Sequence, residues 1–400
     1  MTDEYRVLVV GAGLSGLAAA CALHHNGCPV TVIEREPDKL GLGGQIGVAA
    51  NAASGLERIG LGEVVERYCV PTQRLEYVNW RGHRLTYMPI AEVAQELGTR
   101  TYIALRAEVQ MALYRAVEPA GVVRLGAECV GFTQDADGVT VRLADGSEER
   151  AAAMIGADGL KSVVRASLDG HVPRYAGYGA WRAVLTMDKP PLEPGFGRQT
   201  LGRGRTFGVF ALRENRVYWW ASALGEEGSG VSRDGRKADV TAMFGDGPAY
   251  VREVIEATPE EAILRNDIYD RPPVERWGTG RVTVIGDAAH AATPNTGEGG
   301  SQALLDGVVL GEALAGAGDL RDGAAVEQAL RAFEAEAIPR TRDVIERSRE
   351  IGNFLHFNNP VMCLIRDQIA YRATPMRIWR KRAAMYLETN AAGQAPVAGS

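Results

Sequence analysis

The residues best suited to chemistry lie in residues 282–301, where a β-branched run leads into a polar, glycine-rich turn. Asp287 follows the predicted strand directly, and Gly297, Gly299 and Gly300 precede an apolar helical stretch. A carboxylate at the carboxyl end of a strand suits a ribose-like polyol. The free N–H groups at the start of a helix suit an anionic or flat ligand. The pattern predicts a ligand site, although a Gly-Asp pair also ends strands in ordinary loops.

A second chemical motif lies near the start of the chain, where glycines recur with the spacing G-x-G-x-x-G at Gly11, Gly13 and Gly16. An apolar run precedes them, an Ala-rich helical stretch follows, and the next apolar run ends at Glu34. This setting predicts dinucleotide binding, because the glycines admit a pyrophosphate to the helix N-terminus and the acid accepts bonds from ribose hydroxyls. Arg35 either lies over an adenine ring or faces solvent.

Two further charged positions stand at predicted turns. Residues 153–159 are predicted to form a strand and a turn that contains Asp158 and Gly159, followed by a helix over residues 162–168. Arg106 begins another predicted helix, where a cation opposes the helix dipole. Arg106 therefore either reaches an anion or remains exposed at a small cost.

The composition of the chain limits the classes of function that are possible. The chain has 400 residues, of which 46% are hydrophobic and 24% charged, enough for two domains and a large core. A net charge of −6 argues against a general nucleic-acid binder and favours small-molecule chemistry. The five cysteines form no C-x-x-C pair or Cys/His cluster, so neither disulfides nor a metal site is predicted. No apolar run reaches the roughly 20 residues of a membrane span, and the acidic start predicts a cytoplasmic protein without a signal peptide.

Other stretches predict the elements that position these motifs. Residues 75–97 are predicted to contain a hairpin, and residues 175–271 an aromatic-rich antiparallel sheet that covers a pocket or is plain core. A long helix is predicted over residues 324–352. Residues 361–387 are amphipathic and basic, which predicts either a helix packed on the body or docking to a membrane surface or a partner. The tail from residue 391 is expected to be disordered.

The three glycine-rich motifs follow one another along the chain, first at Gly11 to Gly16, then around Asp158 and finally around Asp287. In this order they resemble the motifs of the class A flavoprotein monooxygenases, which have the p-hydroxybenzoate hydroxylase fold. The closer resemblance is to the branch of salicylate hydroxylase, urate hydroxylase and zeaxanthin epoxidase, and it covers roughly residues 5–352. It implies an α/β fold in which a Rossmann-like FAD-binding domain is interleaved with an antiparallel-sheet substrate domain, followed by C-terminal helices. The expected FAD-binding parts are residues 1–74, 98–174 and 272–352; the substrate parts are 75–97 and 175–271; the C-terminal segment is 353–400.

The resemblance also assigns roles to the cofactor residues. It implies that Glu34 binds the ribose of FAD, that Arg106 lies on the flavin side, and that Asp287 contacts the ribityl chain or a phosphate. Asp158 takes the role of the family's Asp-Gly motif, which serves both FAD and NAD(P)H. Pro294 and the glycines at 297, 299 and 300 are expected against the isoalloxazine.

The implied reaction is reduction of FAD by NAD(P)H, followed by transfer of oxygen from a flavin 4a-hydroperoxide to an aromatic or polyketide-like substrate. Candidate catalytic residues are Arg205 as an anchor for a carboxylate or oxyanion, Tyr218 as a ring or hydroxyl contact, and His290 as a base. Each has an ordinary alternative: a surface ion pair, a core aromatic, and a structural histidine in the cofactor turn. Oligomeric state is not predicted.

One departure from the family pattern affects the expected activity. The family usually has Gln where this chain has Glu298, which would place a negative charge near the flavin. This departure favours one alternative, a flavin-binding protein without turnover. A separate alternative within the flavoenzymes is an epoxidase or reductase that acts on an isoprenoid.

Overall fold

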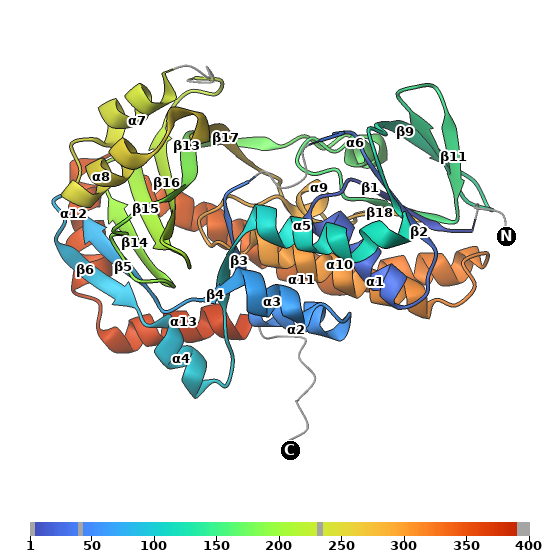
Figure 1. Cartoon of the computed structure of the whole chain (residues 1–400), viewed down its shortest axis with the longest axis horizontal. Coiled ribbons are helices and arrows are strands. Elements are labelled where there is room, and N and C mark those ends of the chain that lie inside the picture. Colours follow the sequence, from blue (N-terminus) through green and yellow to red (C-terminus); the bar gives the residue numbers. More distant parts are fainter. Residues whose placement is uncertain (1–4, 39–42, 230–234, 390–400) are drawn as a thin grey trace.

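A five-stranded parallel sheet forms one half of the molecule (Figure 1). The computed structural model describes residues 5–38, 43–229 and 235–389. Helices α1 (Leu14–His25) and α10 (Gly299–Gly316) pack closely because small residues face each other: a Cβ on Gly311 would lie 2.5 Å from the Cβ of Ala22. Strand β1 is completely buried, as expected for a parallel strand covered on both faces. In sheet order, the strands are β18 (Val282–Val284), β12 (Ala153–Gly156), β1 (Val7–Val10), β2 (Val30–Glu34) and β8 (Val123–Leu125).

Helices and two small sheets surround the parallel sheet. One of the small sheets is an antiparallel meander, and a second three-stranded sheet lies near the cofactor motifs. The meander is β9 (Cys129–Gln134), β10 (Val139–Leu143) and β11 (Glu148–Ala151), and the other sheet is β3 (Gln45–Val48), β7 (Tyr102–Leu105) and β4 (Cys69–Pro71). The helices are α1 (Leu14–His25), α2 (Ala50–Arg58), α3 (Gly62–Tyr68), α5 (Arg106–Val117), η1 (Glu118–Ala120), α6 (Val163–Asp169), α9 (Asp287–His290) and α10 (Gly299–Gly316).

A seven-stranded sheet forms the other half of the molecule (Figure 1). The predicted hairpin joins this sheet because β5 pairs in parallel with β14, more than 100 residues later in the chain. In sheet order, the strands are β17 (Leu264–Asp270), β13 (Arg174–Thr186), β16 (Arg216–Leu224), β15 (Arg205–Ala211), β14 (Phe196–Leu201), β5 (Arg74–Asn79) and β6 (Arg84–Met88). The helices on this side are α4 (Ile90–Glu96), α7 (Arg236–Phe244), α8 (Ala249–Ala257) and η2 (Glu260–Ala262).

The two faces of the seven-stranded sheet differ because side chains alternate along each strand. Trp181, Phe207 and Trp219 form an apolar core with residues of α7 and α8, such as Phe244 and Val251. The alternate residues point to the opposite face, which looks toward the parallel sheet and borders a cavity.

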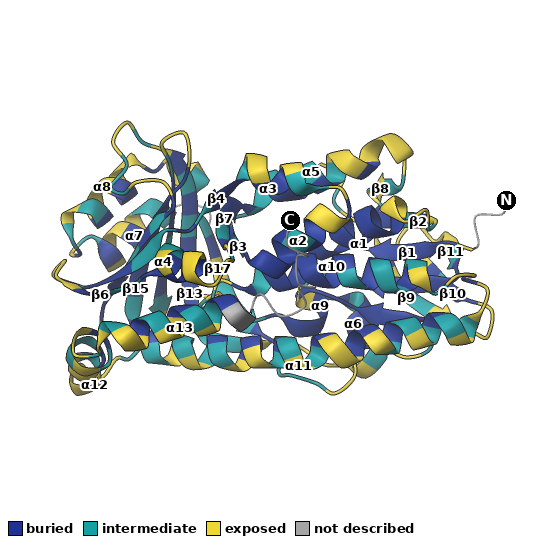
Figure 2. Ribbon diagram, turned by 90° about the horizontal axis from the view of Figure 1, so that it is seen from below, coloured by how far each residue is buried: buried dark blue, intermediate teal, exposed yellow. Residues whose placement is uncertain are grey.

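The C-terminal helices connect the two halves. Helix α11 (Gly323–Leu355) runs along most of the molecule, and α12 (Pro360–Leu364), the π-helix η3 (Ile365–Arg372) and α13 (Met376–Thr389) cover the end of the seven-stranded sheet (Figure 2). Among the described residues, no helix is long and apolar enough to cross a membrane. The predicted α/β fold, with its interleaved halves and C-terminal helices, is confirmed, whereas the tail from residue 391 lies outside the described residues.

Candidate active site

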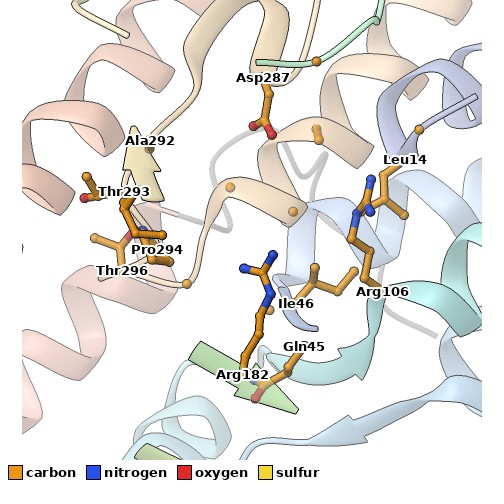
Figure 3. Close-up of a pocket in the computed structure, with 18 of the residues that line it drawn as sticks. Leu14, Gln45, Ile46, Arg106, Arg182, Asp287, Ala292, Thr293, Pro294 and Thr296 are labelled. Atoms are coloured by element: carbon orange, nitrogen blue, oxygen red, sulfur yellow. The ribbon is translucent and has the colours of Figure 1, made fainter. Parts of the chain in front are cut away.

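A cavity of about 800 Å³ is lined by both halves of the molecule. All three glycine-rich motifs reach it from the parallel sheet, and aromatic side chains reach it from the seven-stranded sheet. Figure 3 shows Asp287, Arg106 and Arg182 around this space, with Pro294 and Thr296 on the side opposite Arg106. The cavity therefore has a polar end at the parallel strands and an aromatic end at the seven-stranded sheet.

The first glycine motif forms a turn that other residues would not fit. Gly11 has φ +106°, and a Cβ on it would lie 2.4 Å from the carbonyl oxygen of Ala157. A Cβ on Gly16 would lie 2.0 Å from the carbonyl oxygen of Gly11. Gly13 lines the cavity at the start of α1, and the free N–H groups of a helix N-terminus suit an anionic ligand. The turn is therefore shaped to bring the main chain close to a phosphate.

Glu34 and Arg35 lie at the end of β2, beside this turn, and both line the cavity. The Glu34 carboxylate accepts hydrogen bonds from the main-chain N–H of Ala12 (2.8 Å) and of Glu36 (3.0 Å). These two bonds fix the carboxylate at the edge of the cavity, where it can still accept bonds from ligand hydroxyls. The side chain of Arg35 is more than half exposed, with the Glu36 carboxylate 3.9 Å away.

Asp158 and Gly159 form the turn after β12 and line the cavity. One carboxylate oxygen of Asp158 accepts bonds from the N–H groups of Val163 (2.7 Å) and Val164 (3.2 Å) at the start of α6. The other, Oδ1, is buried and has no hydrogen-bond partner within the described residues. A buried carboxylate oxygen without a partner is costly, so this atom is suited to accept a bond from a ligand.

Arg106 and Asp287 supply opposite charges on two sides of the cavity (Figure 3). Burial lowers the pKa of Arg106, while the nearby Asp287 carboxylate opposes this shift. Pro294 and the three glycines of the 297–300 turn also line the cavity. The structure therefore brings together the residues predicted to bind the cofactor, except Gly16, which packs behind the turn against Gly11.

Glu298 does not place its charge in the cavity. Its side chain is buried, and both carboxylate oxygens accept bonds from Arg347 Nη2 of α11, at 3.0 and 2.8 Å. The sequence predicted that Glu298 would place a negative charge near the flavin, but the Arg347 guanidinium compensates that charge.

His290 is not among the residues that line the cavity. It is buried beside Trp277, and its Nε2 bonds to Asp306, which also accepts a bond from Arg340 Nη2 at 2.9 Å. Burial alone would raise the pKa of Asp306, but the His290 and Arg340 charges hold that pKa below its usual range. This geometry favours the structural alternative over a catalytic base.

Arg205 is wrongly predicted as a substrate anchor. It has the same strand parity as Phe207 and Val209, so it lies on the face covered by α7 and α8. Its Nη2 donates to Asp246 at 2.7 Å, and its guanidinium stacks 4.2 Å from the ring centre of Trp80.

Arg182 is the cation that the sequence reasoning missed. It lines the aromatic end of the cavity from β13, and its Nη2 donates to Asn266 Oδ1 at 2.7 Å. Its Nε is buried without a hydrogen-bond partner among the described residues. Side chains alternate between the two faces of a strand, and Trp181 faces α7 and α8. The neighbouring Arg182 must therefore point to the opposite face, toward the cavity.

Tyr218 lies at the same end of the cavity as Arg182. Burial raises the pKa of the Tyr218 phenol, although the Arg182 charge opposes the shift. Its ring stacks on Trp220, with 5.9 Å between centroids, and Trp220 in turn stacks on Phe210 at 5.8 Å. These rings form an aromatic wall that suits a planar ligand.

Comparison with known proteins identifies the family. Residues 4–348 match the sequence model of a family described as FAD binding domain. The chain is 34% identical to aurachin C monooxygenase/isomerase of Stigmatella aurantiaca, over 92% of this chain and 94% of that protein. It is 33% identical to 3-amino-4-hydroxybenzoate 2-monooxygenase of Streptomyces cremeus, over 91% of each chain. The chain belongs to the class A FAD-dependent monooxygenases.

A solved structure of this monooxygenase family supports the same assignment. HpxO of Klebsiella pneumoniae, complexed with FAD and uric acid, has a TM-score of 0.87 and 28% identity over 96% of this chain and 97% of that chain. The residues at the polar end of the cavity also fit FAD: the glycine turn admits a pyrophosphate, and Asp158 Oδ1 lacks a partner that a ligand hydroxyl would supply.

Proposed function

We propose that this protein is an NAD(P)H-dependent monooxygenase that hydroxylates an aromatic or polyketide-like small molecule. The observation that carries the proposal is that one cavity is lined both by the glycine-rich motifs and by the aromatic wall, with Arg182 beside that wall. The names of the relatives agree with an aromatic substrate, since one acts on an aminohydroxybenzoate and another binds uric acid.

At the polar end, this chain's residues hold the cofactor. Glu34 and Asp158 accept bonds from hydroxyl groups, the turn at Gly11 and Gly13 binds the pyrophosphate, and Asp287 binds the ribityl chain or a phosphate near Arg106. When bound, FAD supplies the redox chemistry, accepting electrons from NAD(P)H and activating dioxygen to deliver one oxygen atom.

At the aromatic end, the residues bind and orient the substrate. Phe210 and Trp220 offer ring faces for stacking, and their apolar surface excludes water from the reacting atoms. Arg182 pairs with an acidic oxygen of the substrate, such as a phenolate, enolate or carboxylate. Tyr218 remains protonated because burial raises its pKa, so it can donate a hydrogen bond to that oxygen.

The proposal is tested by NADH and NADPH oxidation in air with the FAD-loaded protein. The panel should contain phenols, aromatic acids, polycyclic aromatics and neutral aromatics of matched size, and product masses should be recorded. We expect oxidation to be stimulated by compounds with an acidic oxygen, with the gain of one oxygen atom in the product. Bound FAD without stimulation by any compound would contradict the proposal.

A second candidate, an epoxidase that acts on an isoprenoid, is favoured by one observation. Leu75, Met88, Ile90, Ile351 and Leu355 add an aliphatic wall beside the aromatic one. An isoprenoid substrate would stimulate oxidation without an acidic oxygen and would be insensitive to the loss of Arg182. Hydride transfer to the isoprenoid without incorporation of oxygen would indicate a reductase instead.

A further inference from the structure

Large apolar side chains that are exposed are concentrated on the C-terminal helices α12, η3 and α13. Figure 2 shows α12 at one end of the molecule and α13 running from that end toward the middle, both with exposed positions. Seven of the thirteen large apolar side chains that are exposed in the described chain lie within residues 361–385. Val361, Leu364 and Ile369 are 62%, 61% and 63% exposed. A concentration of this kind marks an interaction surface, whereas isolated exposed apolar residues are normal.

Basic side chains flank these apolar residues. Residues 361–387 contain six arginines and lysines and one acid, Asp367, in a chain of net charge −6. Asp367 is bonded to the buried Arg366 at 2.8 Å and does not offset the exposed cations. Arg372, Arg377 and Lys381 are exposed and have no carboxylate partner within the described residues. The surface is therefore both apolar and locally positive, unlike the acidic chain as a whole.

The same segment forms part of the cavity wall on its inner side. Tyr371 of η3 and Tyr386 of α13 line the cavity, as does Leu355 at the end of α11. Burial raises the pKa of Tyr386 to about 12, so this phenol is neutral where it meets the cavity. A partner bound to the outer face would thus lie one helix away from the aliphatic wall of the cavity.

We propose that α12, η3 and α13 dock the protein on the surface of an anionic lipid bilayer. Apolar side chains enter the boundary between headgroups and acyl chains, while the arginines and the lysine pair with anionic headgroups. The acidic remainder of the chain is repelled by such a surface, which orients the molecule with its C-terminal helices toward the lipid. A second copy on this face is disfavoured, because Arg372, Arg377 and Lys381 would meet the same cations of the other molecule. The inference stands apart from the proposed reaction, since binding is measured without turnover.

The test is flotation of the FAD-loaded full chain with vesicles of phosphatidylcholine alone or mixed with phosphatidylglycerol. We expect flotation with the anionic vesicles, weakening as salt increases, and little with phosphatidylcholine. The variant Arg372→Gln/Arg377→Gln/Lys381→Gln should lower the partition coefficient on the order of 100-fold. Leu364→Ser/Ile369→Ser should lower it by about 10-fold. Arg115→Gln and Val172→Ser, at exposed positions outside this surface, are the matched controls and should bind as the parent does.

Bound flavin and the unfolding midpoint, measured for every variant, establish that each one folds. The proposal is overturned if the parent floats with neither vesicle, or if control and surface variants lose binding equally. It is also overturned if sedimentation shows a dimer that Leu364→Ser/Ile369→Ser dissociates, because the surface would then belong to a second copy.

Discussion

The two ends of the cavity are built by different physical means. At the polar end, the main chain sets the geometry: Gly11 has a left-handed φ and Gly16 packs against its carbonyl oxygen. At the aromatic end, side chains set the geometry: Arg182 and Tyr218 reach the cavity because of their parity along antiparallel strands. The polar end therefore tolerates few substitutions in its turns, whereas the aromatic end can change its ligand by single side-chain replacements without altering the fold.

The largest expected effect is at the glycine turn. Gly11→Ala should lower the free energy of unfolding by more than about 3 kcal/mol and abolish FAD binding, because its Cβ would clash with Ala157 and its φ is unfavourable for alanine. Gly27→Ala is the matched control, since Gly27 also has positive φ but open space around it, and should cost about 1 kcal/mol. Denaturant unfolding and FAD titration measure both, and equal losses would contradict the role of the close contact.

Asp287→Ala removes a carboxylate that is proposed to bind FAD at the polar end, without altering the main chain of the turn. We expect FAD affinity to fall about 10- to 100-fold, the usual value of a hydrogen bond to a charged group. Asp188→Ala, at an exposed position, serves as the control. Titration of the apoprotein with FAD measures the change, and unchanged affinity would remove Asp287 from the cofactor site.

Replacing one arginine on each face of the seven-stranded sheet compares the two faces. Arg182→Gln should lower kcat/KM for an acidic aromatic substrate by about 10- to 100-fold while FAD remains bound. Arg205→Gln, on the opposite face, should change kcat/KM by less than about 2-fold. If Arg205→Gln had the larger effect, the assignment of the faces would be wrong.

Among the substitutions of cavity residues, Tyr218→Phe should have the smallest effect, lowering kcat/KM by about 2- to 10-fold through the loss of one neutral hydrogen bond. Because burial raises the pKa of Tyr218 above its ordinary value of 10.0, the phenol stays protonated until the pH exceeds that value. The pH dependence of kcat/KM from about pH 6 to about pH 9 should therefore have the same shape in Tyr218→Phe and in the parent. A step near neutral pH that disappears in the variant would show instead that Tyr218 ionises during turnover.

The difference between the polar and the aromatic end of the cavity also explains which parts of the site could be predicted from the sequence. At the polar end, glycines occupy backbone positions that few other residues can adopt, and Asp158 and Asp287 stand beside such glycines at the ends of strands. The spacing of these residues therefore identifies the turns. The helix that starts at Arg106 was also predicted, and its first residue does line the cavity.

At the aromatic end, the alternation of residues is visible in the sequence, but the identity of the covered face is not. Trp219 packs under α7 and α8 while Trp220 lines the cavity, so both faces carry large aromatic residues. Arg205 was assigned to the wrong face for this reason. His290 posed a different problem, because its partner Asp306, and Arg340, which pairs with Asp306, come from later helices that only the fold brings together.

The most direct test of the account is a turnover experiment under isotopically labelled dioxygen with the FAD-loaded protein, NADH or NADPH, and the substrate that best stimulates oxidation. One labelled oxygen atom should appear in the product of the parent protein, and the yield should fall strongly for Arg182→Gln but not for Arg205→Gln. Oxidation of NAD(P)H that yields only hydrogen peroxide with every substrate, or a product without labelled oxygen, would contradict the claim that the two ends of the cavity form one hydroxylation site.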